Sequence, residues 1–247
     1  MAHTGHRRRF SNLSLVPVVL LFGFFFTACS SGANESNTAM SAQSLVSLAL
    51  RNAIRAGWVH EELQESGGGH SLSMVNDIGS TEGRQVVAVD GAHATVLVLD
   101  GVAYIQGDAN ALANYFGLSS KAQQLVGKWI SLRSSDSKYS TVSDAVTLTS
   151  NFQQVVMNGP FTEGHVVVVD GRSAVPIGGY APVSSGNTAE PATLYVTTAG
   201  TVLPVAYHVS AQQGTQHATL AAIWRDWGRP VTLVAPANAI PISTLGG

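Results

Sequence analysis

A single cysteine, Cys29, limits how this chain of 247 residues can be stabilised. With no second thiol, the chain can form neither an intrachain disulfide nor a cysteine cage around a metal ion. The fold must therefore depend on an apolar core, which a chain of this length can bury. Only 11% of the residues are charged, against about 25% in an average soluble domain, and 45% are apolar. These values predict extensive apolar burial, by packing alone or around a hollow apolar interior.

The position of Cys29 predicts export. Three arginines at 7–9 precede an apolar stretch at 13–28, which is shorter than the roughly 20 residues needed to cross a bilayer. A cationic head, a short apolar run and small residues before a cut site are the features of an export signal. We therefore expect residues 1–28 to be removed. Residues 29–38, rich in Ser and Asn, are expected to form a flexible tether, and residues 39–247 to form one domain.

The residues Phe26-Thr27-Ala28-Cys29 resemble the lipobox of bacterial lipoproteins. This resemblance implies a diacylglycerol on the Cys29 sulfur and an acyl chain, such as palmitate, on the new N-terminus, with no other cofactor. Two acyl chains hold a protein firmly, because each buried methylene contributes about 0.8 kcal/mol. The resemblance thus implies a cell-membrane lipid anchor on the extracytoplasmic side. The alternative is an ordinary export signal with an incidental cysteine.

Charge and motif content argue against several classes of function. Without the three leader arginines, the formal charge of −2 becomes −5, so we expect neither nucleic-acid binding nor a polybasic membrane patch. The sequence lacks a Gly-x-Ser-x-Gly elbow, a P-loop and a His-Glu-x-x-His motif. We therefore predict a protein that is not an enzyme and has no metal site. A triad assembled from distant residues, or two histidines meeting across paired strands, remains open as an alternative.

Hydrophobic periodicity and the order of elements predict an α+β fold, an antiparallel sheet of about ten strands with helices on one face. A twisted sheet of that size tends to curl into a half-barrel. Three Asp-Gly pairs, at 90–91, 100–101 and 170–171, predict tight hairpin turns, and the glycines at 67–69 are interpreted as a flexible link. The expected helices are at 39–56, 109–116, 119–126 and 141–156, with a brief extended link at 128–132. The expected strands are at 71–78, 84–89, 93–99, 102–106, 165–170, 172–177, 192–198, 202–210, 217–224 and 231–234.

Three segments resemble the LolA-like lipoprotein carriers and the LppX/LprG group of actinobacterial lipoproteins. They are the strand-turn-strand at 195–205, the closing segment at 223–236, and the hairpin at 97–105 followed by Gly127-Lys128-Trp129-Ile130. The resemblance covers the order of elements from about residue 39 to the end. It implies a strongly curved antiparallel sheet with helices covering its concave face, which together enclose an apolar cavity for acyl chains. It also implies a role in carrying lipids or glycolipids at the cell envelope.

Strand alternation then predicts which side chains would line such a cavity. The expected lining residues are Val96, Val98, Val167, Val169, Leu194, Val196, Leu203 and Val205. A register error of one residue would move them to the other face. The expected function is to bind or transfer a lipid or glycolipid as a membrane-tethered lipoprotein. The alternative is a tethered interaction or sensor module whose core is filled by its own side chains.

Overall fold

The computed structural model describes residues 37–182, 189–213 and 216–245. These residues belong to a compact unit that spans 34–247. Cys29 and the predicted signal lie outside the described residues. Among the described helices, none combines the length and apolar character needed to cross a membrane.

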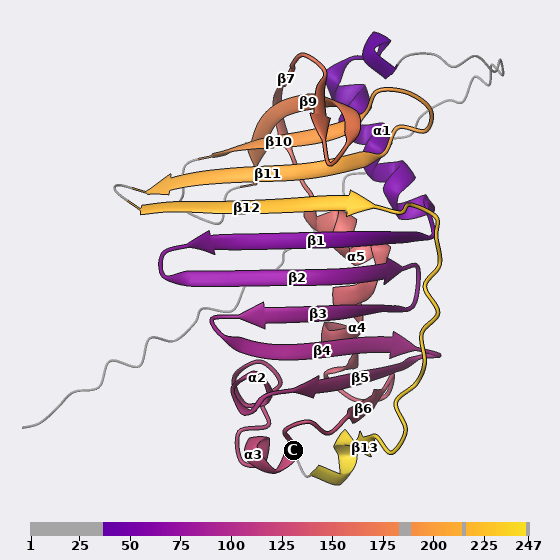
Figure 1. The fold of residues 1–247 in the computed structure, drawn as a ribbon, viewed down its shortest axis with the longest axis vertical. Helices are drawn as coiled ribbons and strands as arrows, with labels where there is room; N and C mark the ends of the chain where they lie inside the picture. Colours follow the sequence, from indigo (N-terminus) through magenta and orange to yellow (C-terminus); the bar gives the residue numbers. More distant parts are fainter. Residues whose placement is uncertain (1–36, 183–188, 214–215, 246–247) are drawn as a thin grey trace, which may run out of the picture. The chain divides into compact units, whose positions relative to one another are not determined.

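The described residues form an open sheet of 13 strands, shown in Figure 1, in the order β13-β6-β5-β4-β3-β2-β1-β12-β11-β10-β9-β7, with β8 paired to β9. All pairings are antiparallel except that of β13 with β6. The strands are β1 (Trp58–Gly67), β2 (His70–Gly79), β3 (Gly83–Val89), β4 (Ala92–Leu99), β5 (Val102–Gly107), β6 (Ile130–Arg133), β7 (Asn158–Glu163), β8 (Val167–Val169), β9 (Arg172–Ala181), β10 (Glu190–Thr197), β11 (Pro204–Gln213), β12 (Gln216–Arg225) and β13 (Ile240–Pro241).

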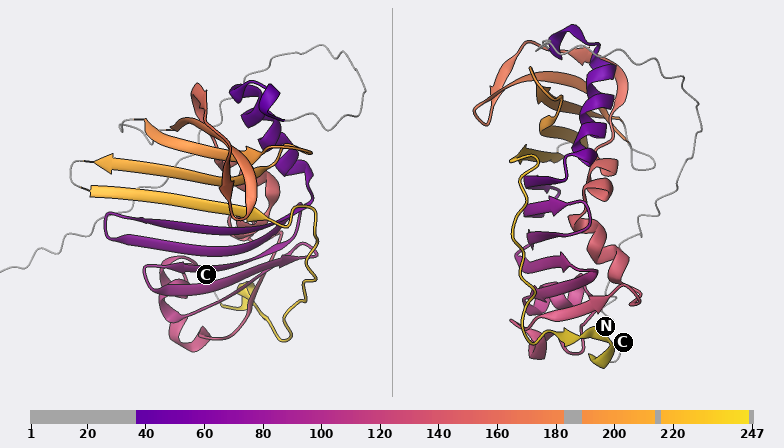
Figure 2. Two further views of the ribbon diagram at one scale, coloured as in Figure 1. Left: turned by 45° about the horizontal axis from the view of Figure 1, so that its top comes forward. Right: turned by 90° about the vertical axis from the view of Figure 1, so that its right-hand side faces the viewer.

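The helices α1, α5 and α4 lie on one face of this sheet (Figures 1 and 2), while α2 and α3 follow β5 in the chain. The predicted α+β class, a curved open sheet with helices on one face, is confirmed. The helical elements are η1 (Asn37–Ala39), α1 (Ala42–Arg55), α2 (Ala109–Asn114), α3 (Ala122–Leu125), α4 (Tyr139–Ser143), η2 (Asp144–Val146), α5 (Leu148–Gln154) and η3 (Ile242–Leu245).

Turn chemistry fixes the hairpin register. In each of the three Asp-Gly pairs, both residues have positive φ, as in Asp100 (53°) and Gly101 (72°). This geometry matches the right-handed twist of the flanking strands, and only Gly, Asn and Asp adopt it readily. The three predicted hairpin turns are confirmed.

Other predictions of local structure were wrong. The sheet has 13 strands rather than about ten: β1, β7 and β13 were missed, and β6 was expected only as a brief extended link at 128–132. Residues 67–69 form the tight β1–β2 turn rather than a flexible link, since β1 pairs with β2 along its whole length. The predicted helix at 141–156 is broken where Thr147 is extended and bridges to Gly79. Residues 231–234 form no strand, because the chain from 226 to 239 runs past the strand ends toward β13 (Figure 1).

The core contains two main apolar clusters on the helix-covered face. The first joins α1 and α5 to β1 and β9–β12, with Leu45, Phe152 and Trp224 among its members. The second joins β4–β6 to α2, α3, α4 and η2, around Val98, Ile130 and Val146. The indole of Trp224 and the ring of Phe152 have centroids 5.2 Å apart, which fixes α5 above β12.

The close approach of η2 to β3 leads to a stability prediction. A Cβ placed on Gly83 would lie 2.7 Å from the Val146 carbonyl oxygen and 2.6 Å from that of Asp77. Gly83→Ala should therefore lower the free energy of unfolding by about 1–3 kcal/mol, as overpacking does, measured by urea denaturation. Val86→Ala, on the exposed side of the same strand, is the control and should cost much less. Equal effects of the two substitutions would contradict the close packing of η2.

Candidate functional site

A row of polar side chains crosses the middle of the helix-covered face. Glu61 of β1 pairs with Asn76 of β2, and Asn76 pairs with Gln85 of β3. Trp224 of β12 continues the row on one side and Val96 of β4 on the other. Residues directly opposite in antiparallel strands project from the same face. The row therefore joins the first apolar cluster, at Trp224, to the second, at Val96.

All three polar residues of this row are buried, with exposed fractions of 4% for Glu61, 0% for Asn76 and 8% for Gln85. The Trp224 indole N–H donates to Glu61 Oε1 at 2.7 Å, and Asn76 Nδ2 donates to Glu61 Oε2 at 2.6 Å. Gln85 Nε2 donates to the weak acceptor Met74 Sδ at 3.3 Å. Among the described residues, Asn76 Oδ1 has no partner. A buried amide oxygen without a partner is costly, so this atom is an acceptor available to a ligand or a water molecule.

Burial raises the pKa of Glu61 above its ordinary value of 4.5, because desolvation disfavours the carboxylate. The hydrogen bonds from Asn76 and Trp224 and the charge of His60 offset part of this effect. A neutral carboxyl is also a donor, and the 2.6 Å separation fits an O–H···O bond to Asn76 with its amide turned over. Either amide orientation leaves one polar atom of Asn76 unpaired within the described residues.

Three short helices, α4, η2 and α5, lie over the row and are called the helical cover here. The 3-10 helix η2 lies against β2 and β3, and α5 contacts Trp224 through Phe152. Neither α4 nor α5 has a side-chain hydrogen bond at its N-cap, and isolated helices of this length are unstable in water. The stability of the cover therefore comes from its apolar contacts with the sheet, and moving it would leave the strand pairing intact.

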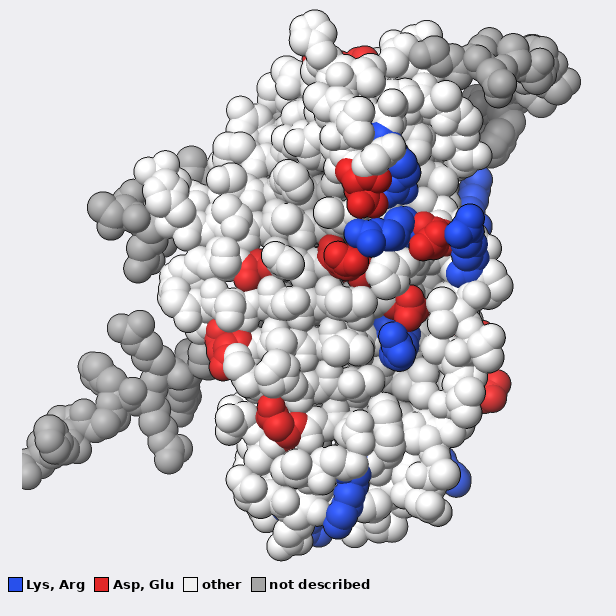
Figure 3. Space-filling view, viewed as in Figure 1, with Lys and Arg blue, Asp and Glu red and all other residues white. Residues whose placement is uncertain are grey.

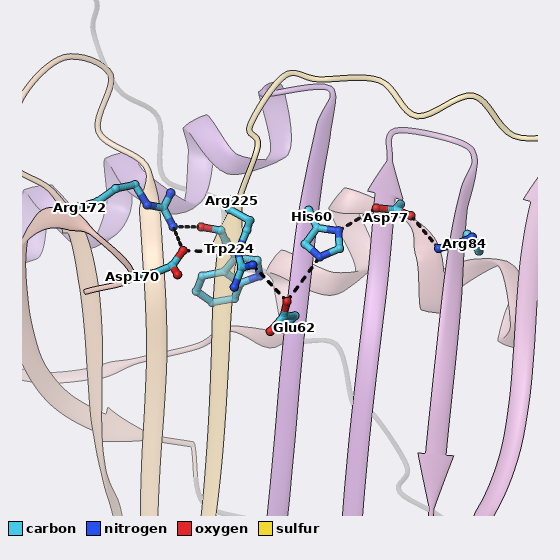
Figure 4. A network of polar contacts seen from close by, with 8 residues as sticks. All are labelled: His60, Glu62, Asp77, Arg84, Asp170, Arg172, Trp224 and Arg225. Carbon is cyan, nitrogen blue, oxygen red and sulfur yellow. Dashed lines mark hydrogen bonds and ion pairs between the residues drawn. The ribbon is translucent and has the colours of Figure 1, made fainter. Parts of the chain in front are cut away.

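The opposite face of the sheet carries a second polar feature, a row of charges drawn in Figure 4. Figure 3 shows these charges as a band of alternating sign on a face that is otherwise largely uncharged. The ion pairs link neighbouring strands and attach the β8–β9 turn to β12. In order, the members are Arg84, Asp77, His60, Glu62, Arg225, Asp170 and Arg172.

The histidine of this charged row does not have the geometry of a catalytic triad. His60 Nδ1 lies 2.9 Å from Asp77 Oδ1, and His60 Nε2 lies 3.8 Å from Glu62 Oε1. Both ring nitrogens thus face carboxylates, whereas a triad needs one of them to face a nucleophile. Within the described residues, no group of three or more His, Cys, Asp or Glu side chains could hold a metal ion.

The predicted cavity-lining residues do not form one set. Val96 and Val98 belong to the second apolar cluster and Leu194 and Val196 to the first, each with at most 3% exposed. Val205 is fully buried in β11, beside the bulge in its pairing with β10.

The remaining three predicted lining residues lie elsewhere. Val167 and Val169 are in the short strand β8, where Val167 is 39% exposed and Val169 half-buried. Leu203 precedes β11 in the loop from β10 and is also half-buried. The structure describes hollows on α1, on the open sheet face and near η3. None of these three hollows is lined by a predicted cavity residue. The assignment of these side chains to a lipid cavity stays a prediction.

Sequence reasoning missed the buried polar row, although a signal for it was present. Glu61 lies between Val59 and Leu63 at apolar spacing, and Asn76 likewise lies between Met74 and Ile78. A polar residue at an inward position of an alternating strand is a candidate for a functional role. Because β1 itself was missed, its inward positions were not identified.

The raised pKa of Glu61 makes a prediction about pH. The folded state holds this proton more tightly than the unfolded state, so the stability contributed by the neutral carboxyl is complete below pH 4.5. It is lost as pH rises toward the folded-state pKa. Glu61→Gln, which keeps a neutral group of similar shape, should remove this loss. In urea denaturation across pH 4–8, the difference in stability between variant and wild type should therefore rise with pH. Parallel stability curves would show that Glu61 does not titrate in this way.

The comparisons with known proteins concern the fold. No protein-family model and no curated protein matches the sequence. The structure is similar to that of LprF from Mycobacterium bovis, with a TM-score of 0.51 and 15% sequence identity over 80% of this chain and 97% of LprF. The lipoprotein LppX of Mycobacterium tuberculosis gives a TM-score of 0.48 and 20% identity over 78% of this chain and 99% of LppX. The likeness to LprF confirms the predicted resemblance for the fold alone, and the chain has the open α+β fold of LprF.

Proposed function

We propose that this protein is a membrane-tethered lipoprotein that binds a lipid or glycolipid between its sheet and its helical cover. The observation that carries this proposal is the buried polar row that joins two apolar clusters. An amphipathic ligand needs apolar surroundings for its chains and hydrogen-bonding partners for its head, and this face offers both. Asn76 would hydrogen-bond a hydroxyl or amide group of the ligand, beside the buried Glu61.

The energetics favour acyl chains as the apolar part of the ligand. Each Å² of apolar surface removed from water contributes about 25 cal/mol, whatever the chain structure. Polar groups buried without hydrogen bonds cost several times more than a methylene gains. The row would therefore position the head of the ligand, while the two apolar clusters accept its chains with little selectivity.

Entry of a ligand requires the cover to move. We infer that the segment 139–156, which contains α4, η2 and α5, is the part that opens. Within the described residues, two polar links join this segment to the sheet. They are the Thr147 bridge to Gly79 and the Tyr207 hydroxyl, which donates to the Val156 carbonyl at 3.4 Å. By contrast, α1 is held by Asn52, whose side-chain amide donates to the Val202 carbonyl at 2.9 Å.

One observation favours a second candidate function, a tethered interaction or sensor module with a filled core. Four predicted lining residues, Val96, Val98, Leu194 and Val196, pack within clusters that include the protein's own helices. In that case the buried row would serve to hold the strands in register.

Native mass spectrometry of the mature protein mixed with phospholipid vesicles separates the two functions. Lipid adducts are expected on the wild type. Asn76→Leu should reduce adduct occupancy several-fold, because it removes the free amide from the row. The control Asn52→Leu removes a half-buried amide on α1, away from the row, and this variant should still bind lipid. If the wild type carries no lipid adducts, the interaction module is supported. If both variants lose the same share of lipid adducts, the row is not part of the binding site.

The anchor gives a separate prediction. Because the thiol of Cys29 is the proposed acylation point, Cys29→Ser should release the protein from membranes or leave its signal uncut. Membrane fractionation shows whether the variant is released, and its intact mass shows whether the signal has been cut. A processed Cys29→Ser protein that still needs detergent for extraction would contradict the anchor.

A further inference from the structure

We propose that three consecutive valines, Val166, Val167 and Val168, form a second contact with the membrane surface. This inference rests on the proposed anchor at Cys29. The three residues, defined here as the valine edge, are 52%, 39% and 72% exposed. Successive side chains of an extended segment point to opposite faces. Exposure of all three therefore shows that this edge of the β8–β9 hairpin is open to solvent on both faces.

Such an edge requires an explanation. Exposed apolar side chains on a strand edge promote unwanted pairing, and natural sheets normally protect such edges with charges, prolines or cover. An exposed apolar patch accordingly marks a surface that meets another molecule. Here β8 pairs with β9 through Val168 opposite Ser173 and Val167 opposite Ala174.

The valine edge lies close to the point where the chain enters the described domain. The first described residue, Asn37, donates its backbone N–H to the Thr198 carbonyl and its side-chain amide to the Thr197 carbonyl, both at 2.9 Å. Thr198 Oγ1 in turn donates to the Ser173 carbonyl at 3.5 Å. Ser173 is the residue directly opposite Val168.

This position keeps the valine edge within reach of the anchor. Cys29 is eight residues before Asn37, a distance of at most about 29 Å for a fully extended chain. An acylated Cys29 would thus hold this end of the domain near the bilayer. The tether makes the second contact effectively intramolecular, so a small apolar patch is sufficient.

The chemistry around the valine edge points to the apolar part of the bilayer rather than to anionic headgroups. The sequence has no Lys or Arg between Lys138 and Arg172. Arg172 faces Asp170, and Asp170 also pairs with Arg225 of the sheet. Because the two arginines that adjoin the β8–β9 turn are both paired with Asp170, we expect attraction to anionic lipids to contribute little. The contact should therefore be the same on zwitterionic and anionic membranes and insensitive to salt.

Site-specific fluorescence tests this contact in the mature, acylated full chain bound to phosphatidylcholine vesicles. Val168→Cys is labelled with an environment-sensitive dye, since acylation blocks the native thiol. Val86→Cys, 43% exposed on β3, is the matched control. Quenchers carried on the lipid chains should quench the dye at residue 168 several-fold more than the dye at residue 86. Val166→Cys provides a second labelling position and should behave like Val168→Cys.

Three results would overturn the proposal. Equal, weak quenching at residues 168 and 86 in membrane-bound protein would show that the valine edge faces water. Self-quenching at residue 168 that increases with protein density would identify a second copy of this chain as the partner. Protein that stays in the supernatant would show that the anchor itself fails, and the proposed tethered function with it.

Discussion

The alternation of side chains in antiparallel strands is the constraint on which this structure depends. Most buried apolar residues of β4, β5 and β9 to β12 point to the helix-covered face, and the charged row lies on the opposite face. Register then aligns Glu61, Asn76 and Gln85 across three strands. A shift of one residue in β1 would bring His60 and Glu62 into the core and expose Glu61. The two polar rows, one on each face, follow from the same register.

The two rows have different physical roles. On the open face, most members of the ion pairs are partly exposed, so water screens them and each pair contributes little to stability. Asp77, which pairs with His60 and Arg84, is the buried member. The geometry of the ion pairs attaches the β8–β9 turn to β12 and so determines where the valine edge lies. On the covered face, water is excluded, and each polar atom must find a partner or destabilise the fold. Among the described residues, Asn76 still has a buried polar atom without a partner, which destabilises the fold. A ligand that pairs with this atom would remove that cost, so the inner row is the candidate binding site.

The sequence was sufficient to predict the class of fold but not all of its strands. The Asp-Gly turns and the helix ending before Gly57 were identified because each is a local signal with a local cause. The strand β1 was missed because its Glu-rich pattern lacks a strong apolar alternation and is stabilised by two long neighbours, β2 and β12. The break at Thr147 also depends on a distant contact, with Gly79. The inner polar row could not be predicted without β1, since pairing alone brings its members together.

The central claim is that a lipid lies between the helical cover and the inner row. A crystal structure of the mature protein, purified from membranes without delipidation, tests this most directly. If a lipid lies there, the electron density is continuous between the row and the segment 139–156, with a polar group within hydrogen-bonding distance of Asn76. We also expect α5 to lie farther from Trp224 than the 5.2 Å between ring centroids found here. A core packed as described above, with no density beside Asn76, would contradict the claim.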